Sequence, residues 1–374
     1  MSKTYLVTGG AGFIGRHLCL ELLAAGCEVK ILDALIPQVH RGRDMIADLP
    51  SDIAFIEGDI RDPQAVRTAL DGVDGVFHLA AEVGVGQSMY EIDRYVGVND
   101  LGTAVLLQAL VEKPVRRIVV ASSMSVYGEG RYVDGAGRPV PAQRRTPADI
   151  ERRNWDIRHA GGETLRPAPT DEEKPVDLAS IYALTKYVQE RAVLLFAEAY
   201  RREAVALRLF NVFGPGQALS NPYTGVLANF SSRIAAGERP MVFEDGLQRR
   251  DFVHVRDVAR AFCLAMEAPA ANGHVITSAA AIPMRSPMSP ACSPAPWGAT
   301  SSRRFSENPG PATSATALRT STRRAICSAS HPRTASRSRS SSSPPGWRDR
   351  TMSIWARRCA SSSNATASFR EVSA

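Results

Sequence analysis

The sequence contains little lysine and little cysteine. Its 374 residues include five lysines against 40 arginines, and none of its six cysteines forms a CxxC pair. The cysteines therefore predict incidental thiols in a reducing compartment and argue against a disulfide framework or a zinc site. His40, His78 and His254 also show no metal-ligand spacing. We expect these histidines to pack or to form hydrogen bonds in loops, and we expect no bound metal.

Long apolar runs are missing as well. No stretch approaches the roughly 18 apolar residues that a membrane-spanning helix requires, and no signal segment precedes the first strand-like stretch. The sequence therefore predicts a cytoplasmic protein with no membrane partner.

The positive charge is concentrated at one end of the chain. The whole chain carries a net charge of +7, and residues 278–374 contribute 14 Arg, one Asp and two Glu, which is +11. The first 277 residues therefore carry −4, the difference between +7 and +11. The basic balance belongs to the last hundred residues or so, and it gives no reason to expect that the folded part binds nucleic acid.

The first motif indicates a nucleotide site. Residues 3–33 read KTYLVTGGAGFIGRHLCLELLAAGCEVKILD, a strand, a glycine-rich turn, a helix and a second strand ending in Asp33. Gly9, Gly12 and Gly15 allow a tight turn and let backbone amides approach a pyrophosphate at the start of the helix. Asp33 is placed to bind a ribose diol and to repel a 2′-phosphate, which favours NAD over NADP.

Further strands follow in the same rhythm. IAFIEGDI, GVDGVFHLAA and RRIVVASS are each followed or preceded by helix-length segments such as residues 99–112. This alternation predicts a doubly wound parallel sheet of the Rossmann type, with ligands at the carboxyl ends of its strands. We expect a Rossmann domain over residues 1–180, a smaller substrate-binding portion over 181–276, and a tail over 277–374.

A pair of residues four apart suggests acid–base chemistry. SIYALTKYVQE places Tyr182 and Lys186 on one face of a helix. A nearby ammonium lowers the pKa of a tyrosine and so prepares it to act as a base, and a cationic nicotinamide acts in the same direction. We therefore expect Lys186 to lower the pKa of Tyr182. The same spacing also suits a packing tyrosine beside a solvated lysine.

The order of these motifs resembles a known family. TGGAGFIG, GDIRD, HLAA, SSMSVYG, YALTK, LRLFNVFGPGQ and RDFVHVRDVARA occur as they do in extended short-chain dehydrogenases/reductases of the nucleotide-sugar epimerase and dehydratase group. The resemblance covers residues 3 to about 276 and implies NAD as cofactor, a nucleotide sugar as substrate and a homodimer built around helices that include 99–112 and 182–200.

The resemblance also implies roles for individual residues. Ser123, Tyr182 and Lys186 are implied as catalytic, with Tyr182 as base and Ser123 bonded to the reacting hydroxyl. The implied NAD contacts are Gly9, Gly12, Phe13, Ile14, Gly15, Asp33, Asp59, Ile60, Leu79, Ala80, Ala81, Asn99, Tyr182 and Lys186. Ser123, Asn211 and Arg250 are implied to contact the substrate. Asn211 also suits a turn before Gly214, and Arg250 suits an ion pair with Asp251 or Asp257.

The expected reaction follows from what replaces two family residues. Dehydratases of the group carry an Asp and a Glu after the position of Ser123, and this chain has Met124 and Ser125 there. Neither side chain can act as acid or base for loss of water. We therefore expect epimerisation at C4 through a transient ketone. The alternatives are another NAD-dependent nucleotide-sugar oxidoreductase or dehydratase of the same group, and a catalytically impaired NAD-binding protein with a basic interaction tail.

Substrate identity depends on weaker signals. GQALSNPYTGV at 216–226 resembles the dTDP-L-rhamnose 4-epimerase branch, and many UDP-galactose epimerases carry a Lys near the position of Val83. The arginine-rich segment 129–175 is absent from those epimerases and shows almost no hydrophobic periodicity. We expect a solvated excursion there, and a lid over an anionic substrate is the alternative.

The last part of the chain has a different character. Of the 97 residues from Ser278, 23 are Ser and 14 are Arg, and the periodicity of helices and strands does not return. The tail suits a disordered RNA-binding segment, an inert extension or a shifted reading frame. Relatives commonly continue GHVIN with VGSG, and the codons AAC GTC GGC AGC GGC can encode this Asn-Val-Gly-Ser-Gly. Without their first base, these codons encode Thr-Ser-Ala-Ala-Ala, which are residues 277–281 of this chain. We favour the frameshift, and we expect an incomplete substrate domain, a disordered tail and impaired activity.

Overall fold

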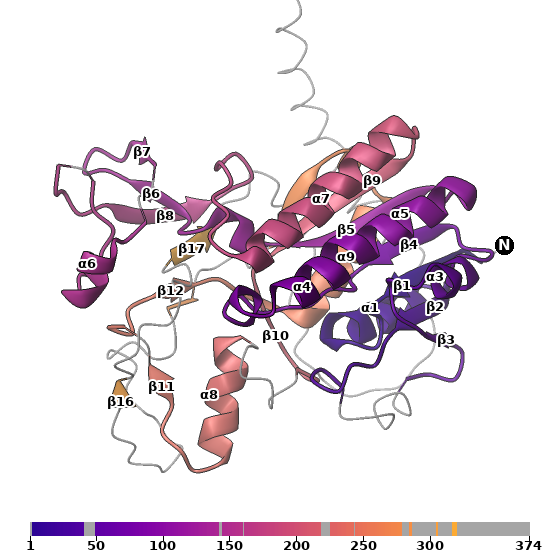
Figure 1. Ribbon diagram of the computed structural model, residues 1–374, viewed down its shortest axis with the longest axis horizontal. Helices are drawn as coiled ribbons and strands as arrows, with labels where there is room; N and C mark the ends of the chain where they lie inside the picture. The colour runs from indigo at the N-terminus through magenta and orange to yellow at the C-terminus, as the bar shows by residue number, and fades with distance from the viewer. Residues whose placement is uncertain are drawn as a thin grey trace, which may run out of the picture.

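A seven-stranded parallel sheet forms the centre of the molecule (Figure 1). The structure, a computed structural model, describes residues 2–40, 49–141, 144–159, 161–217, 225–242, 244–278, 284–285, 304–305 and 316–319. The strand order is β14-β9-β5-β4-β1-β2-β3, and every neighbouring pair runs parallel. The strands are β1 (Thr4–Thr8), β2 (Glu28–Asp33), β3 (Ala54–Glu57), β4 (Gly75–His78), β5 (Arg117–Ser123), β9 (Glu203–Leu209) and β14 (Val275–Ser278). This order confirms the predicted Rossmann sheet.

Helices cover both faces of this sheet. One face carries α1 (Phe13–Ala24) and α9 (Val255–Glu267), which pack on each other. The other carries α3 (Pro63–Ala69), α5 (Gly102–Glu112) and α7 (Ile181–Ala199). The short turn η1 (Gln87–Met89), α4 (Ile92–Tyr95) and a π-helix, η2 (Val96–Leu101), precede α5, and η4 (Pro269–Ala271) follows α9. The predicted helix over 99–112 therefore begins in a π-helical turn.

The alternation of side chains along each strand divides the core in two. Tyr5 and Val7 of β1 face the cluster that includes α1 and α9, whereas Leu6 faces the cluster under α3, α5 and α7. Phe77 and Val76 of β4 repeat this pattern, and all five are buried. Both faces are covered, as the near-continuous apolar runs of a parallel sheet predict.

The segment 129–175 is folded, which contradicts the expected solvated excursion. It forms β6 (Arg131–Val133), β7 (Pro139–Val140), α6 (Pro147–Glu151) and β8 (Arg166–Thr170) after the turn η3 (Met124–Tyr127). Tyr132, Ile157 and Leu165 make a small core of their own. These three residues are far apart in sequence and meet only through the sheet, so local periodicity does not reveal them.

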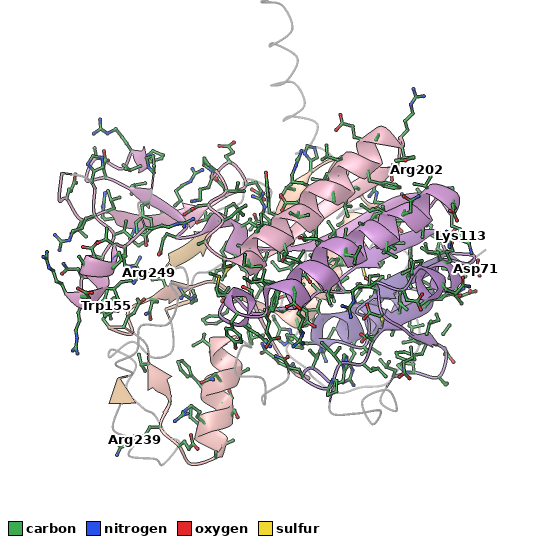
Figure 2. The ribbon with its side chains drawn as sticks, viewed as in Figure 1. Asp71, Lys113, Trp155, Arg202, Arg239 and Arg249 are labelled. Atoms are coloured by element: carbon green, nitrogen blue, oxygen red, sulfur yellow. The ribbon has the colours of Figure 1, made fainter. Side chains whose placement is uncertain are left out.

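This segment is part of a smaller unit beside the main sheet (Figure 1). A six-stranded sheet has the order β15-β12-β17-β8-β6-β7, and two further strand pairs are β10–β13 and β11–β16. The remaining elements are β10 (Asn211–Phe213), α8 (Val226–Ala235), β11 (Met241–Val242), β12 (Arg249–Arg250), β13 (Phe252–His254), β15 (Met284–Arg285), β16 (Arg304–Phe305) and β17 (Thr316–Arg319). Trp155 and Arg249 lie on this unit (Figure 2).

The boundary predicted at residue 277 falls inside a strand. Thr277 and Ser278 are buried in β14, and the Thr277 hydroxyl lies 3.1 Å from that of Tyr127. Most of the predicted tail lies outside the described residues, which include from it only Thr277 and Ser278 and the strands β15, β16 and β17. Within the described part, no helix combines the length and the apolar character needed to cross a membrane.

Candidate active site

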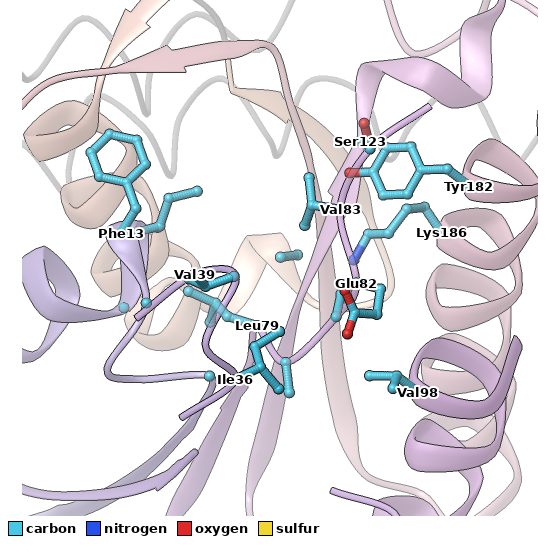
Figure 3. A pocket seen from close by; sticks show the side chains of 18 of the residues that line it. Phe13, Ile36, Val39, Leu79, Glu82, Val83, Val98, Ser123, Tyr182 and Lys186 are labelled. Atoms are coloured by element: carbon cyan, nitrogen blue, oxygen red, sulfur yellow. The ribbon is translucent and has the colours of Figure 1, made fainter. Parts of the chain in front are cut away.

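A cavity of about 820 Å³ opens at the carboxyl ends of the central strands. Most of the predicted site residues line it, namely Gly9, Gly12, Phe13, Ile14, Gly15, Asp33, Asp59, Ile60, Leu79, Ala80, Ala81, Ser123, Tyr182, Lys186 and Asn211. Figure 3 shows part of this wall, with Phe13 on one side and Tyr182 on the other. Parallel strands end at one edge of the sheet, which is why residues far apart in sequence meet here. The ion pair of Lys113 with Asp71 lies at the other edge (Figure 2).

The glycine turn after β1 leaves no room for side chains. Gly9 has φ of 69°, and a Cβ atom there would lie 2.8 Å from the backbone nitrogen of Ala80. A Cβ at Gly15 would lie 2.5 Å from the carbonyl oxygen of Gly9. Gly12 caps α1 without a side-chain acceptor, and no acidic residue lies in the first helical turn. The amides at the start of α1 therefore have no side-chain cap, and the positive end of the helix dipole remains available for an anion.

Asp33 connects the end of β2 to the glycine turn. Its Oδ2 accepts a 3.0 Å hydrogen bond from the Ala11 backbone, and its Oδ1 accepts a 2.9 Å bond from that of Leu35. His40 lies nearby, with Nε2 3.6 Å from Asp33 Oδ1. Each carboxylate oxygen accepts one backbone bond and keeps a lone pair toward the cavity, which suits a ribose hydroxyl.

Asp59 is a second acidic residue at the cavity wall and follows the end of β3. It pairs with Arg61, whose NH2 donates a 2.6 Å hydrogen bond to Asp59 Oδ2. The side-chain bond from Arg61 lowers the pKa of Asp59. Asp59 therefore remains ionised beside Ile60 at neutral pH.

Ser123 and Tyr182 come from two different elements and meet at the other end of the cavity. Ser123 ends β5, and Tyr182 lies in the first turn of α7, which begins after the N-cap Ser180. Ser88 holds this turn by accepting a 3.0 Å hydrogen bond from the Tyr182 backbone. The Tyr182 hydroxyl points toward Ser123 (Figure 3).

The charge environment of Tyr182 differs from the predicted one. Burial raises the pKa of Tyr182, and a hydrogen bond with Ser123 opposes this shift. Burial also lowers the pKa of Lys186 to about 7. The predicted lowering of the Tyr182 pKa is therefore wrong for the protein's own groups, because burial outweighs the opposing hydrogen bond from Ser123.

A buried hydrogen-bond chain behind Lys186 was not predicted. Lys186 Nζ donates a 2.6 Å bond to Gln189 Oε1, and Gln189 Nε2 lies 3.2 Å from His78 Nε2. His78 Nδ1 lies 2.8 Å from the Thr8 hydroxyl, and burial lowers the pKa of His78 to about 3. The imidazole is therefore neutral, and the chain joins the end of β1 to Lys186. The one feature of the sequence that could have indicated this chain is Gln189, which follows Lys186 by three residues on the same helical face.

The residues after Ser123 cannot supply an acid–base pair. Met124 lines the cavity, and Ser125 donates a 3.0 Å hydrogen bond from its hydroxyl to Ser123 Oγ. Asn211 also lines the cavity, and its Nδ2 donates a 3.1 Å bond to the carbonyl of Asp251. The oxygen of the Asn211 amide therefore remains available at the cavity wall.

Two predicted residues lie away from the cavity wall. Asn99 is fully buried, accepts a 2.7 Å hydrogen bond from the Glu82 backbone and donates a 2.9 Å bond to Thr185 Oγ1. It connects the loop after β4 to α7 and makes no contact in the cavity. Arg250 lies instead among Glu129, Arg145 and Glu244 in the smaller unit. These neighbours differ from Asp251 and Asp257, which were its alternative ion-pair partners.

The described residues fit an NAD molecule. The backbone of the glycine turn packs too closely for side chains at Gly9 and Gly15, α1 presents amides without a side-chain cap, and Asp33 lies at the cavity wall where a ribose diol would bind. The acidic side chain at Asp33 disfavours the 2′-phosphate of NADP. The cavity volume of about 820 Å³ lies within the range of cofactor sites.

Comparison with known families agrees with this fit. The family described as NAD dependent epimerase/dehydratase matches residues 5–148 and 159–277. The chain belongs to this family. NAD is accordingly its cofactor, and its activity falls in the epimerase/dehydratase class.

Several members of the NAD dependent epimerase/dehydratase family are similar over most of this chain. The dTDP-L-rhamnose 4-epimerase of Burkholderia thailandensis is 38% identical over 264 residues, which cover 69% of this chain and 71% of that protein. The UDP-glucose 4-epimerase of Thermotoga maritima, solved with UDP-glucose, is 29% identical with a TM-score of 0.61, covering 75% and 78%. The enzyme of the same name from Thermus thermophilus, solved with NAD, is 28% identical with a TM-score of 0.58, covering 75% and 79%.

Proposed function

We propose that this protein is a nucleotide-sugar 4-epimerase that oxidises C4 of the sugar and reduces it again on the other face. The observation that carries the proposal is the meeting of Ser123, Tyr182 and Lys186 at one end of an NAD cavity. Nucleotide-sugar 4-epimerases are also the proteins to which the chain is similar.

In the proposed reaction, Tyr182 removes the proton of the C4 hydroxyl. Bound NAD⁺ supplies the hydride acceptor for C4 and a positive charge beside the phenol. Ser123, held by Ser125, donates or accepts the hydrogen bond that orients the reacting oxygen. Tyr182 then returns its proton when the ketone is reduced, so neither a proton nor a hydride is consumed overall.

Lys186 assists by position and by charge. Its ammonium lies one helical turn from Tyr182 and is held by Gln189. Because burial raises the pKa of Tyr182, an extra positive charge is needed to favour the phenolate. We propose that protonated Lys186 and the cofactor provide that charge together.

The fate of the ketone follows from the neighbours of Ser123. Met124 and Ser125 carry no group that removes a proton from C5 or protonates a leaving hydroxyl at C6. We therefore propose that the ketone turns within the cavity and receives the hydride on its opposite face.

For the substrate, we propose a dTDP-6-deoxyhexose of the dTDP-L-rhamnose type ahead of UDP-glucose. The similarity to the Burkholderia thailandensis enzyme supports this order. Val83 at the cavity wall, where many UDP-galactose epimerases carry a lysine, supports it as well. Asn211 is the proposed contact to the substrate on the cavity wall, whereas Arg250 does not line that cavity.

We also propose a cytoplasmic homodimer that pairs through α5 and α7. These helices expose apolar side chains, among them Val111, Leu184 and Leu195. Sedimentation of the full chain tests this: a monomer at micromolar concentration contradicts it. The shifted reading frame stays a hypothesis, which the nucleotide sequence around codon 277 tests.

The activity itself is tested with dTDP-L-rhamnose and UDP-glucose in separate incubations without added NAD. We expect NMR to show the C4 epimer of one sugar, no accumulation of NADH, and no product from a Tyr182→Phe variant. A stoichiometric rise in NADH indicates a dehydrogenase and contradicts the proposal. Bound NAD without turnover of either sugar indicates a non-catalytic protein or another substrate class.

A further inference from the structure

Two loops that line the NAD cavity are joined by side chains. Residues 34–40 follow β2, and residues 79–85 follow β4 and lead into η1 and α4. Gln38 Nε2 donates a 2.8 Å hydrogen bond to Gln87 Oε1, and Arg94 NH2 donates a 3.0 Å bond to Gln38 Oε1. A third contact, from Gln87 Nε2 to Gln38 Oε1, measures 3.3 Å. These three residues, Gln38, Gln87 and Arg94, are called the clasp below.

The far side of the clasp is firmly anchored. Arg94 Nε lies 2.9 Å from Glu82 Oε1, and Arg94 NH1 donates a 2.8 Å bond to Glu91 Oε2. The backbone of Glu82 is held in turn by Asn99. Gln87 is only 4% exposed and donates a 2.9 Å bond to Glu91 Oε1. Several part-buried bonds together fix these side-chain positions, so Gln38 joins a firmly held support.

The clasp belongs to the cavity wall. Gln38, Glu82 and Arg94 all line the cavity that also contains Gly9, Asp33 and Tyr182. The two loops can separate at this point only if the bonds of Gln38 break. Within the part of the chain that the structure describes, these side-chain bonds connect residues 34–40 to the segment 79–95, and no backbone hydrogen bond joins the two.

We propose that Gln38 and Arg94 are cofactor-retaining residues, whose bond at the cavity wall slows the release of NAD. An enzyme that returns the hydride to its own product needs the same NAD in every cycle. A clasp made of side-chain bonds suits that need, because the two loops cannot part here until those bonds break. The proposal rests on NAD as the cofactor and not on which sugar is the substrate.

The size of the effect follows from the number of bonds. A net hydrogen bond changes an equilibrium or a rate about three- to tenfold. Gln38→Ala removes all three contacts and is expected to speed NAD release about tenfold or more. Arg94→Lys keeps a positive charge for Glu82 but cannot contact Glu82, Glu91 and Gln38 at once. It is expected to speed release about three- to tenfold.

The experiment follows bound radiolabelled NAD as excess unlabelled NAD replaces it in the full-length protein. Matched controls are Gln64→Ala, an exposed glutamine of α3, and Arg67→Lys, whose guanidinium pairs with Glu112 on the surface. We expect both controls to release NAD within twofold of the unchanged protein. Equal release from Gln38→Ala and Gln64→Ala overturns the proposal.

A double variant separates the clasp from a general loss of stability. If Gln38 and Arg94 act through their shared bond, the double variant releases NAD at most about twice as fast as Gln38→Ala alone. Multiplied single effects indicate independent disturbances and contradict the clasp. Thermal unfolding of each variant in saturating NAD is expected to match the controls within a few degrees. A variant that unfolds much earlier while releasing NAD faster also contradicts the proposal, because its defect is then global.

Discussion

Lys186 and Gln189 are joined by a 2.6 Å hydrogen bond from Nζ to Oε1, one turn apart on α7. Gln189 also donates a 2.9 Å bond to Thr103, so its amide is fixed before any ligand binds. The position of the Lys186 ammonium is therefore set by the chain behind the cavity. This relationship makes Gln189 the group through which the charge of Lys186 can be altered without changing Lys186 itself.

A Gln189→Glu substitution should move the alkaline limb of the pH profile. A carboxylate beside Lys186 favours its protonated form and so raises its pKa from about 7. If protonated Lys186 supports catalysis, we expect the alkaline fall of kcat/KM to shift upward by about one pH unit. Gln64→Glu, on the exposed face of α3, is the control and should leave the profile unchanged. An unchanged limb in Gln189→Glu argues against a role for the Lys186 charge.

Removal of the two hydroxyls should separate their proposed roles. Tyr182→Phe keeps the ring but removes the proposed base, and we expect kcat to fall about 10³-fold or more while bound NAD is retained. Ser123→Ala should lower kcat about 10- to 100-fold. Ser125→Ala, which removes only the hydroxyl that bonds to Ser123 Oγ, should cost less than about tenfold. Steady-state rates and the NAD content of each purified variant provide the check. Comparable losses in the Ser123 and Ser125 variants count against direct contact of Ser123 with substrate.

Burial of Lys186 should appear in the pH dependence of stability. Its pKa is about 7 in the folded protein, whereas the pKa of an ordinary exposed lysine is 10.5, so the unfolded chain binds more protons between these limits. Folding stability contributed by Lys186 therefore rises with pH from about 7 to about 10. We expect Lys186→Met to raise the free energy of unfolding above that of the unchanged protein, and we expect this increase to be about 1 to 3 kcal/mol larger at pH 7 than at pH 9. Urea unfolding at both pH values measures this, and an equal difference at both shows that Lys186 titrates normally.

Cofactor choice should depend on Asp33. Asp33→Asn keeps the oxygen that accepts from one backbone amide but removes the negative charge at the ribose site. We expect NAD to bind about tenfold more weakly and NADP binding to improve, because repulsion of the 2′-phosphate is relieved. Asp52→Asn, on the surface, is a charge-matched control. Calorimetric titration with both cofactors tests this, and an unaltered NAD/NADP ratio contradicts the assignment.

Sequence patterns predicted the parts of the molecule that depend on local order. The strand, turn and helix around Gly9 to Gly15 are specified by adjacent residues, and the ends of parallel strands meet by topology alone. Asp33, Asp59, Ala80 and Ser123 were therefore placed correctly at one cavity. The spacing of Tyr182 and Lys186 likewise predicted their shared helix.

Features that depend on distant contacts were missed or were predicted wrongly. The small core of Tyr132, Ile157 and Leu165 has no local period, so segment 129–175 looked unstructured. The direction of the Tyr182 pKa depends on burial by elements that the sequence does not localise. The Gln38–Arg94 bond spans 56 positions, and no motif marks either residue.

The central claim is that hydride leaves C4 of a nucleotide sugar and returns to the opposite face of the same carbon. It is tested most directly with dTDP-L-rhamnose that carries deuterium at C4, incubated with the full-length protein and followed by NMR. We predict a product with inverted configuration at C4 that retains the deuterium, because the label is held by the retained cofactor between the two transfers. Inversion with loss of the label to solvent, or deuterium released as free labelled NADH, contradicts the account.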